Sequence, residues 1–94
     1  MLRIQRDEDE GDHVTLILQG RLVTGWTDLL ERECGELRRA GRRVVLDLSE
    51  LVFIGPTGLE TLARLARSGV GIVGCSPLIA AMLEQEGVAV TRTN

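Results

Sequence analysis

Segments with the pattern of buried strands alternate with segments of helical periodicity from residue 14 onward, and this alternation leaves the chain few possible folds. Strand–helix–strand order implies right-handed crossovers and parallel pairing of the strands. An earlier strand-like segment precedes the acidic turn Asp7–Asp12 and is expected to form an antiparallel hairpin. The predicted strands are residues 2–6, 13–20, 43–51, 70–74 and 88–93, and the predicted helices are residues 24–40, 56–69 and 76–87.

The order of these segments predicts an α/β fold in a single domain, residues 1–94. We expect a mixed, mostly parallel five-stranded sheet with three helices, in the order β-β-α-β-α-β-α-β. A chain of 94 residues has room for one core. That core must be aliphatic, because the sequence has one Trp, one Phe and no Tyr.

Composition also limits the possible partners. The formal net charge of −3 gives no electrostatic basis for binding nucleic acid or an anionic membrane, and the scarcity of aromatic residues argues against stacking on single-stranded nucleic acid. No apolar run approaches the ~18 residues that a membrane span needs, and residues 1–12 do not resemble a signal peptide. We therefore expect a cytoplasmic protein with no membrane insertion.

The sequence offers little support for catalysis, metal binding or a cofactor. Cys34 and Cys75 are far apart, and His13 is the only histidine, so a metal site and a Cys–His or Ser–His–Asp arrangement are not expected. Asp47 and Glu50 follow a strand and could act as an acid–base pair, but carboxylates at strand ends commonly bind backbone. We expect two free thiols, no cofactor and no enzymatic activity.

Residues that favour helix starts and helix ends flank the predicted helices. Thr24 or Thr27 could cap the first helix, and Gly41 is expected to stop it. Ser76 is a natural N-cap for the last helix, with Pro77 at its first position and Gly87 at its end. The arginines near residue 40 could form a patch for a phosphate or an acidic partner, although a solvated helix end fits them better; these are Arg38, Arg39, Arg42 and Arg43.

The segment "FIGPTGLETLARL", residues 53–65, has two compatible interpretations. Thr57 and Glu60 match a capping box, whose loss costs about 1 kcal/mol, with Gly55 allowing an unusual backbone angle and Pro56 stiffening the entry. A helix start is also a favourable place for a phosphate, because unpaired N–H groups and the positive end of the helix dipole face it. Thr57 is therefore both a candidate cap and a candidate phosphorylation site.

The stretch "VVLDLSELVFIGPTGLETLARL" resembles the core of the STAS domain, found in bacterial anti-sigma factor antagonists and in the cytoplasmic tails of sulfate transporters. "LILQGRL" is similar to the family's L-x-G-x-L segment, and "VGIVGCSPLIAAMLEQEGV" to its fourth strand and following helix. Thr57, Gly58 and Leu59 fall on the family's phosphorylatable Ser or Thr, glycine and leucine. Gly55 and Pro56 depart from the usual aspartate and small residue.

The resemblance implies a regulatory protein that binds an anti-sigma factor serine/threonine kinase and is released when the kinase phosphorylates Thr57. The expected contact surface combines the start of the helix with the loop 20–25, which should lie beside it because strand C-terminal ends gather at one edge. Its candidate residues are Gly20, Arg21, Thr24, Gly55, Pro56, Thr57, Gly58, Leu59 and Glu60. The resemblance also allows another role, a STAS subunit without a phospho-switch in an ABC-type lipid transporter or a stress-signalling scaffold.

Overall fold

The computed structural model describes residues 1–8 and 11–90. Within these residues the strands are β1 (Leu2–Glu8), β2 (His13–Leu22), β3 (Arg43–Ile54) and β4 (Gly71–Val73). The helices in the same residues are α1 (Thr27–Arg39), α2 (Pro56–Arg67) and α3 (Pro77–Gln85). The chain therefore alternates strand and helix from β2 to α3, as the sequence predicted.

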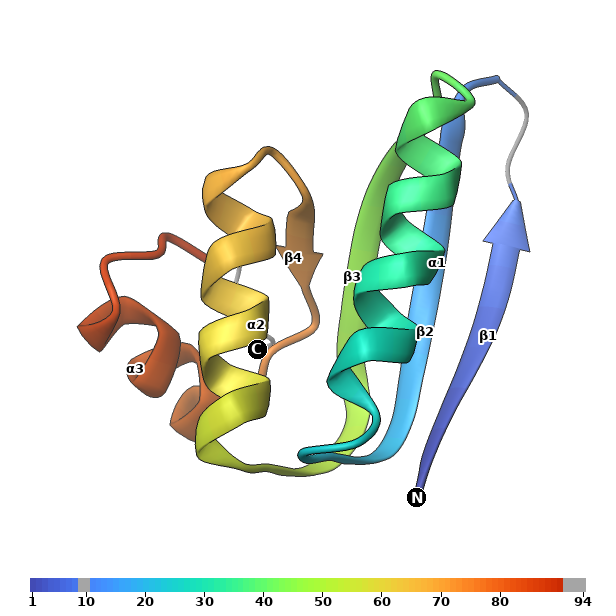
Figure 1. Ribbon diagram of the computed structural model, residues 1–94. Helices are drawn as coiled ribbons and strands as arrows, with labels where there is room; N and C mark the ends of the chain where they lie inside the picture. The colour runs from blue at the N-terminus through green and yellow to red at the C-terminus, as the bar shows by residue number, and fades with distance from the viewer. Residues whose placement is uncertain (9–10, 91–94) are drawn as a thin grey trace.

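The strands form one mixed sheet in the order β1-β2-β3-β4. β1 pairs with β2 antiparallel, whereas β2 with β3 and β3 with β4 are parallel. Figure 1 shows α1 and α2 side by side on one face of the sheet, with α3 beyond α2 on the side away from β1. The two crossover helices thus cover the same face and enclose the core between helices and sheet.

The prediction of a mostly parallel five-stranded sheet is wrong in detail, because the sheet of the described residues has four strands, joined by one antiparallel and two parallel pairs. The expected fifth strand, residues 88–93, is not a strand at 88–90, and residues 91–93 lie outside the described part. Val88 closes α3 instead: its N–H donates to the Leu83 carbonyl (3.1 Å), and its side chain is buried.

The core is aliphatic, as the composition required. β2 and β3 alternate buried and partly exposed residues along their first halves, so each strand turns one face toward the helices. One stripe of α1 packs on that face, and Trp26 packs only at its margin. Fully or almost fully buried side chains at the centre are Val14, Leu16, Leu18, Leu30, Cys34, Leu46, Leu48 and Leu62.

All three described helices end in the same way, at a glycine with positive φ. The residue after each glycine donates its N–H to the carbonyl five residues earlier, which satisfies a carbonyl that the helix leaves free. These bonds are Arg42 to Leu37 (3.0 Å), Val70 to Leu65 (3.1 Å) and Val88 to Leu83 (3.1 Å). The predicted stops at Gly41 and Gly87 are confirmed, with φ of 80° and 82°.

The predictions for the helix starts are only partly correct. Ser76 caps α3 as predicted, because its Oγ accepts the Ile79 N–H (3.3 Å), and Pro77 follows at the first helical position. Neither Thr24 nor Thr27 caps α1, which begins at Thr27 with Trp26 as an N-cap without a side-chain bond. Residues 23–26 form a turn instead, closed by the Trp26 N–H on the Val23 carbonyl (3.0 Å).

The arginines near the end of α1 contact neighbouring elements. Arg38 donates to the hydroxyl (2.8 Å) and the carbonyl of Ser68, at the end of α2. Arg42 pairs with Glu8 of β1 at 3.0 Å, and Arg43 lies 3.9 Å from Asp12. Three of the four arginines are thus engaged in contacts within the protein.

Replacing Ser76 with alanine should lower the free energy of unfolding by about 1 kcal/mol, because the Ile79 N–H loses its acceptor. Urea unfolding followed by circular dichroism measures the change. Ser49→Ala is the matched control: Ser49 is exposed, and its backbone N–H, which donates to Asp47 Oδ1 (2.9 Å), is kept in the alanine variant. We expect that variant to stay within about 0.5 kcal/mol of the parent. An equal loss in both variants would contradict the capping role.

Candidate functional site

The parallel strands β2, β3 and β4 all end on the same side of the molecule, at the bottom of Figure 1. We call this side the carboxyl edge, and define it by the strand ends Leu22, Ile54 and Val73. The connections from strand to helix lie here, and each predicted site residue belongs to the end of β2, the turn after it, or the start of α2. In α/β folds this edge is where binding residues gather.

The start of α2 rests directly on the end of β2. The Gly55 N–H donates to the Leu22 carbonyl at 2.9 Å, and Leu22 pairs in register with Ile54. A Cβ on Gly58 would lie 2.5 Å from the Leu22 oxygen and 3.0 Å from its Cγ, so the contact requires the absence of a side chain. The predicted proximity of the loop 20–25 to the helix start is therefore confirmed.

Thr57 does not cap the helix, so the capping-box prediction is wrong. The helix begins at Pro56, its N-cap is Gly55, and no side chain caps it. Proline has a fixed φ and no N–H, which suits the first helical position, so the N-cap is Gly55, two residues before Thr57. Gly55 has φ −86° and ψ 173°, an ordinary extended backbone rather than the unusual angle expected.

The Thr57 hydroxyl instead meets the Thr24 hydroxyl, with 2.7 Å between the two oxygens. Both threonines are exposed, so this bond joins the β2–α1 turn to the first turn of α2 at the surface. Both residues were candidates from the sequence, but their contact was not predicted. No sequence signal could have identified it, because it depends on how the turn 23–26 folds back toward α2.

The other predicted residues divide into exposed and structural ones. Gly20 has φ +98°, and a Cβ there would lie 2.5 Å from the Met1 carbonyl, so Gly20 serves the β1–β2 contact. Leu59 is half-buried and packs against the core. The exposed members of the set are Arg21, Thr24, Pro56, Thr57 and Glu60. Gly20, Gly55, Gly58 and Leu59 position these exposed side chains.

Two exposed apolar residues at the carboxyl edge were missed by the sequence analysis. The register of β3 against β2 shifts twice, between the Ile17 and Gln19 pairs and between the Gly20 and Arg21 pairs, each time with one extra residue in β3. Such bulges break the alternation of faces. Val52 and Phe53 are consequently both exposed, and the Arg21 guanidinium lies over the Phe53 ring, 5.1 Å from its centroid.

The titratable groups of the core do not form a reactive centre in the described residues. Burial raises the pKa of the Cys34 thiol to about 11 and also raises the pKa of Cys75, to which the charge of Asp47 adds. Thiols with raised pKa are poor nucleophiles at neutral pH. Residues 1–8 and 11–90 contain no group of three His, Cys, Asp or Glu that could hold a metal ion.

In the described part of the chain, none of the helices has both the length and the apolar character needed to cross a lipid bilayer.

Comparisons with known proteins place the fold. The chain is similar to the anti-sigma factor antagonist SpoIIAA in its unphosphorylated form, at 15% identity and a TM-score of 0.78, covering 98% of this chain and 89% of SpoIIAA. It is also similar to an uncharacterised Shewanella loihica protein with a SpoIIAA-like fold, at 14% identity and a TM-score of 0.60, covering 97% and 83%. No family model and no curated protein matches the chain.

A third similar structure belongs to a longer protein. Mglu matches at 29% identity with a TM-score of 0.58; the match covers 93% of this chain, which spans only 18% of the length of Mglu. The matches to SpoIIAA and to the protein with a SpoIIAA-like fold confirm the STAS-like α/β fold that the sequence resemblance predicted.

Gly58→Ala should destabilise the protein by about 1–3 kcal/mol, because the new methyl group meets a backbone carbonyl that cannot move without shifting β2. Gly35→Ala in α1 is the matched control. Its Cβ would contact only the Arg39 side chain at 3.5 Å, so it should stabilise the helix by about 0.5–1 kcal/mol. Thermal and urea unfolding compare the two variants, and a gain at both positions would refute the close contact.

Proposed function

We propose that this protein is a non-enzymatic regulatory module, an anti-sigma factor antagonist that binds an anti-sigma factor kinase and is switched by phosphorylation of Thr57. In this proposal it acts in the cytoplasm as a single domain, residues 1–94. Binding of the kinase frees a sigma factor, and transfer of a phosphoryl group to Thr57 releases the module. The fold shared with SpoIIAA and the exposure of Thr57 support this function.

The observation that carries the proposal is the placement of the Thr57 hydroxyl. It lies exposed in the first turn of a helix that no side chain caps. The N–H groups of Thr57 and Gly58 belong to the set that an α-helix leaves without intrahelical acceptors. A phosphate on Thr57 would have these donors and the positive end of the helix dipole close by, so the modified helix should remain folded.

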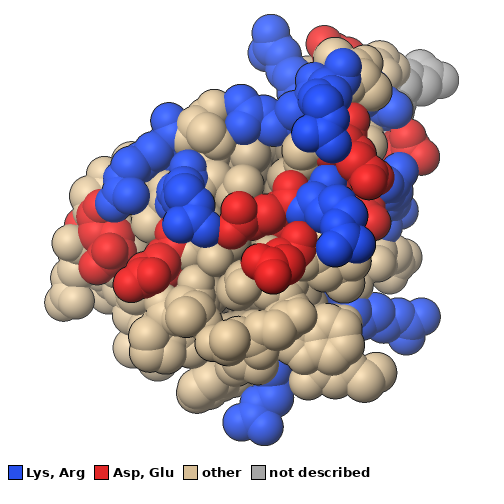
Figure 2. All heavy atoms as spheres, in the orientation of Figure 1, with Lys and Arg blue, Asp and Glu red and all other residues tan. Residues whose placement is uncertain are grey.

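The same placement gives phosphorylation an effect on binding. A phosphate adds about −1.5 to −2 charges at pH 7 and replaces the hydroxyl that now meets Thr24. Figure 2 shows basic and acidic side chains together over the upper and middle parts of one face, whereas the lower part carries few charges. A partner packed on this lower surface would have to desolvate the new charge, and would therefore be released.

The proposed contact surface follows the carboxyl edge. Thr57 and Thr24 lie at its centre, joined by their hydroxyls, with Arg21, Pro56 and Glu60 as the other exposed members of the set. Gly20, Gly55, Gly58 and Leu59 support this surface rather than contact the partner. The proposal involves no cofactor and no nucleic acid.

A second function is a constitutive STAS subunit of a larger assembly, such as an ABC-type lipid transporter or a stress-signalling scaffold. The specific observation in its favour is the match to Mglu, in which a module of this size is 18% of the chain. Gly55 and Pro56, which replace the aspartate and small residue usual before the phosphorylated position, favour it as well. In this role Thr57 would make permanent contacts and receive no phosphate.

Phosphoryl transfer separates the two functions. The module is incubated with ATP and the anti-sigma-type kinase encoded nearest to it, and intact-mass spectrometry is used to detect a gain of one phosphate. We expect the gain in the parent and in Thr24→Ala, and none in Thr57→Ala. A gain that persists in Thr57→Ala would exclude Thr57 as the acceptor, and no gain in the parent would favour the constitutive subunit.

Partner affinity gives an independent prediction. Thr57→Glu should weaken binding to the kinase by about tenfold or more, because a charge enters the centre of the contact surface. Thr57→Ala should change the affinity by less than about threefold. Gln85→Glu adds the same charge at the exposed end of α3 and serves as the control. Isothermal titration calorimetry measures all three; equal affinities for the two glutamate variants would contradict the proposed surface.

A further inference from the structure

A groove lies beside the proposed contact surface, between the end of β3 and the start of α3. Its volume is about 230 Å³, and apolar side chains from both elements form most of its wall. The lining residues are Leu51, Val52, Phe53, Ile54, Ser76, Leu78, Ile79 and Met82. None of the sequence-predicted site residues lines it, although its β3 wall ends at Ile54, directly before Gly55.

Three of the four large apolar side chains exposed in the described part of the chain line the groove. Val52 is 77% exposed, Leu78 71% and Phe53 45%, and Met1 is the only other large apolar side chain exposed among these residues. Isolated apolar side chains are common on protein surfaces, but a contiguous apolar hollow is typical of a binding site. Two of the three side chains are exposed because of the bulges in β3, which turn consecutive residues outward.

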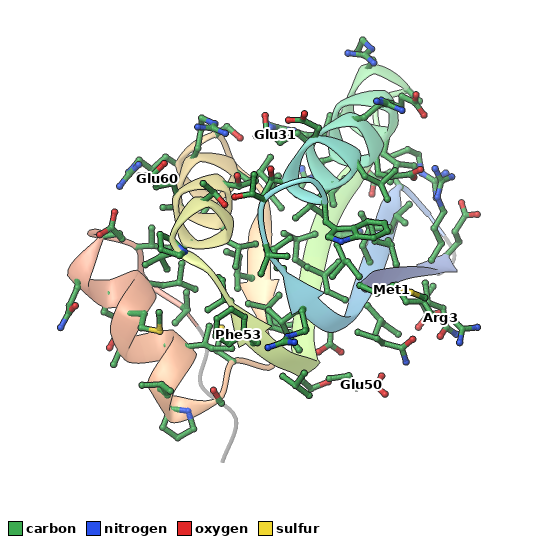
Figure 3. All side chains as sticks on the ribbon, turned by 60° about the horizontal axis from the view of Figure 1, so that its bottom comes forward. Met1, Arg3, Glu31, Glu50, Phe53 and Glu60 are labelled. Carbon is green, nitrogen blue, oxygen red and sulfur yellow. The ribbon has the colours of Figure 1, made fainter. Side chains whose placement is uncertain are left out.

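Arg21 places a positive charge at one side of the groove. The Arg21 guanidinium lies 5.1 Å from the centroid of the Phe53 ring, and within residues 1–8 and 11–90 it forms no ion pair. The nearest acidic residue along β3, Glu50, accepts a hydrogen bond from Gln19 (3.1 Å). In Figure 3 Phe53 lies toward α3, whereas Glu50 lies toward Arg3 and β1. A carboxylate brought to the Phe53 side would therefore meet an unpaired cation.

We propose that this groove docks an amphipathic helix of the partner protein. One or two large aliphatic side chains of that helix enter the groove, and an adjacent carboxylate pairs with Arg21. This inference rests on the proposed function and adds the chemistry of the partner: apolar anchors at helical spacing, flanked by acid. The charge pattern favours this occupant, because the free cation beside the apolar wall complements an acidic helix and repels a basic one.

The two parts of the surface are continuous, and this has a consequence for the switch. Arg21 and Phe53 are a register pair, and the next pair, Leu22 and Ile54, adjoins the Gly55 contact that supports Thr57. An acidic helix lying in the groove would thus approach the start of α2. A phosphate on Thr57 has the same sign of charge as that helix and would repel it, which adds to the cost of desolvation.

The test uses three synthetic helical peptides and the ¹⁵N-labelled full chain. The first peptide carries leucines along one face with flanking glutamates; the second has lysines in place of the glutamates, and the third has serines in place of the leucines. Chemical-shift mapping locates the binding site, and titration gives each Kd. We expect shifts centred on Val52, Phe53, Leu78 and Met82, with the acidic peptide binding at least about tenfold more tightly than either other peptide.

Substitutions separate the contribution of the apolar groove to peptide binding from that of the Arg21 charge. Val52→Ser and Leu78→Ser should each weaken the acidic peptide by about tenfold, whereas Ala81→Ser, an exposed control on α3 outside the groove, should leave it unchanged. Arg21→Gln should abolish the preference for the acidic over the lysine peptide, and Arg39→Gln at the far end of α1 should preserve it. All five positions are exposed, and thermal melting checks that each variant is folded.

Several results would overturn the inference. Equal affinity for all three peptides, shifts that map away from α3, or binding unaffected by Leu78→Ser would exclude the groove as the docking site. Co-sedimentation with phosphatidylcholine–phosphatidylglycerol vesicles, lost in Leu78→Ser while no peptide binds, would identify a lipid contact instead. None of these experiments involves a kinase or phosphorylation of Thr57, so the groove and the Thr57 switch can each fail without the other.

Discussion

The contact between the Leu22 carbonyl and the first turn of α2 determines where the exposed groups of the carboxyl edge lie. The Gly55 N–H donates to this oxygen, and Gly58 has no side chain to keep the helix away from it. The end of β2 and the start of α2 are thereby held at backbone distance. The Thr24 and Thr57 hydroxyls can meet only because of this approach. The chemistry proposed for Thr57 thus depends on two glycines that contribute no functional group.

Much of the fold could be predicted from short patterns in the sequence. Alternating strand and helix segments give the order of elements, and Gly41, Gly87 and Ser76 fix helix ends because positive φ and side-chain capping are properties of single residues. The pattern failed where two local signals competed. Thr57 and Glu60 match a capping box, but Pro56 suits the first helical position better, so the cap moved to Gly55.

The sequence predicted which segments lie near one another at the candidate site, but it did not predict the contacts between their side chains. The rule that parallel strands end at one edge brought the loop 20–25 to the start of α2, whereas the bond between Thr24 and Thr57 depends on the fold of a turn that the sequence assigned to a helix. The groove was not predicted either. Its exposed residues Val52 and Phe53 look like strand core, and only the pairing of β3 with β2 shows that both face outward.

The bulges of β3 also separate two parts of the chain that can change independently. Up to Leu48, the strand keeps strict alternation against β2, and these residues form the centre of the core. Beyond it, the two extra residues shift the register without altering the pairing upstream. A residue gained or lost between 49 and 53 would therefore change which side chains face outward at this edge, while the core upstream keeps its register.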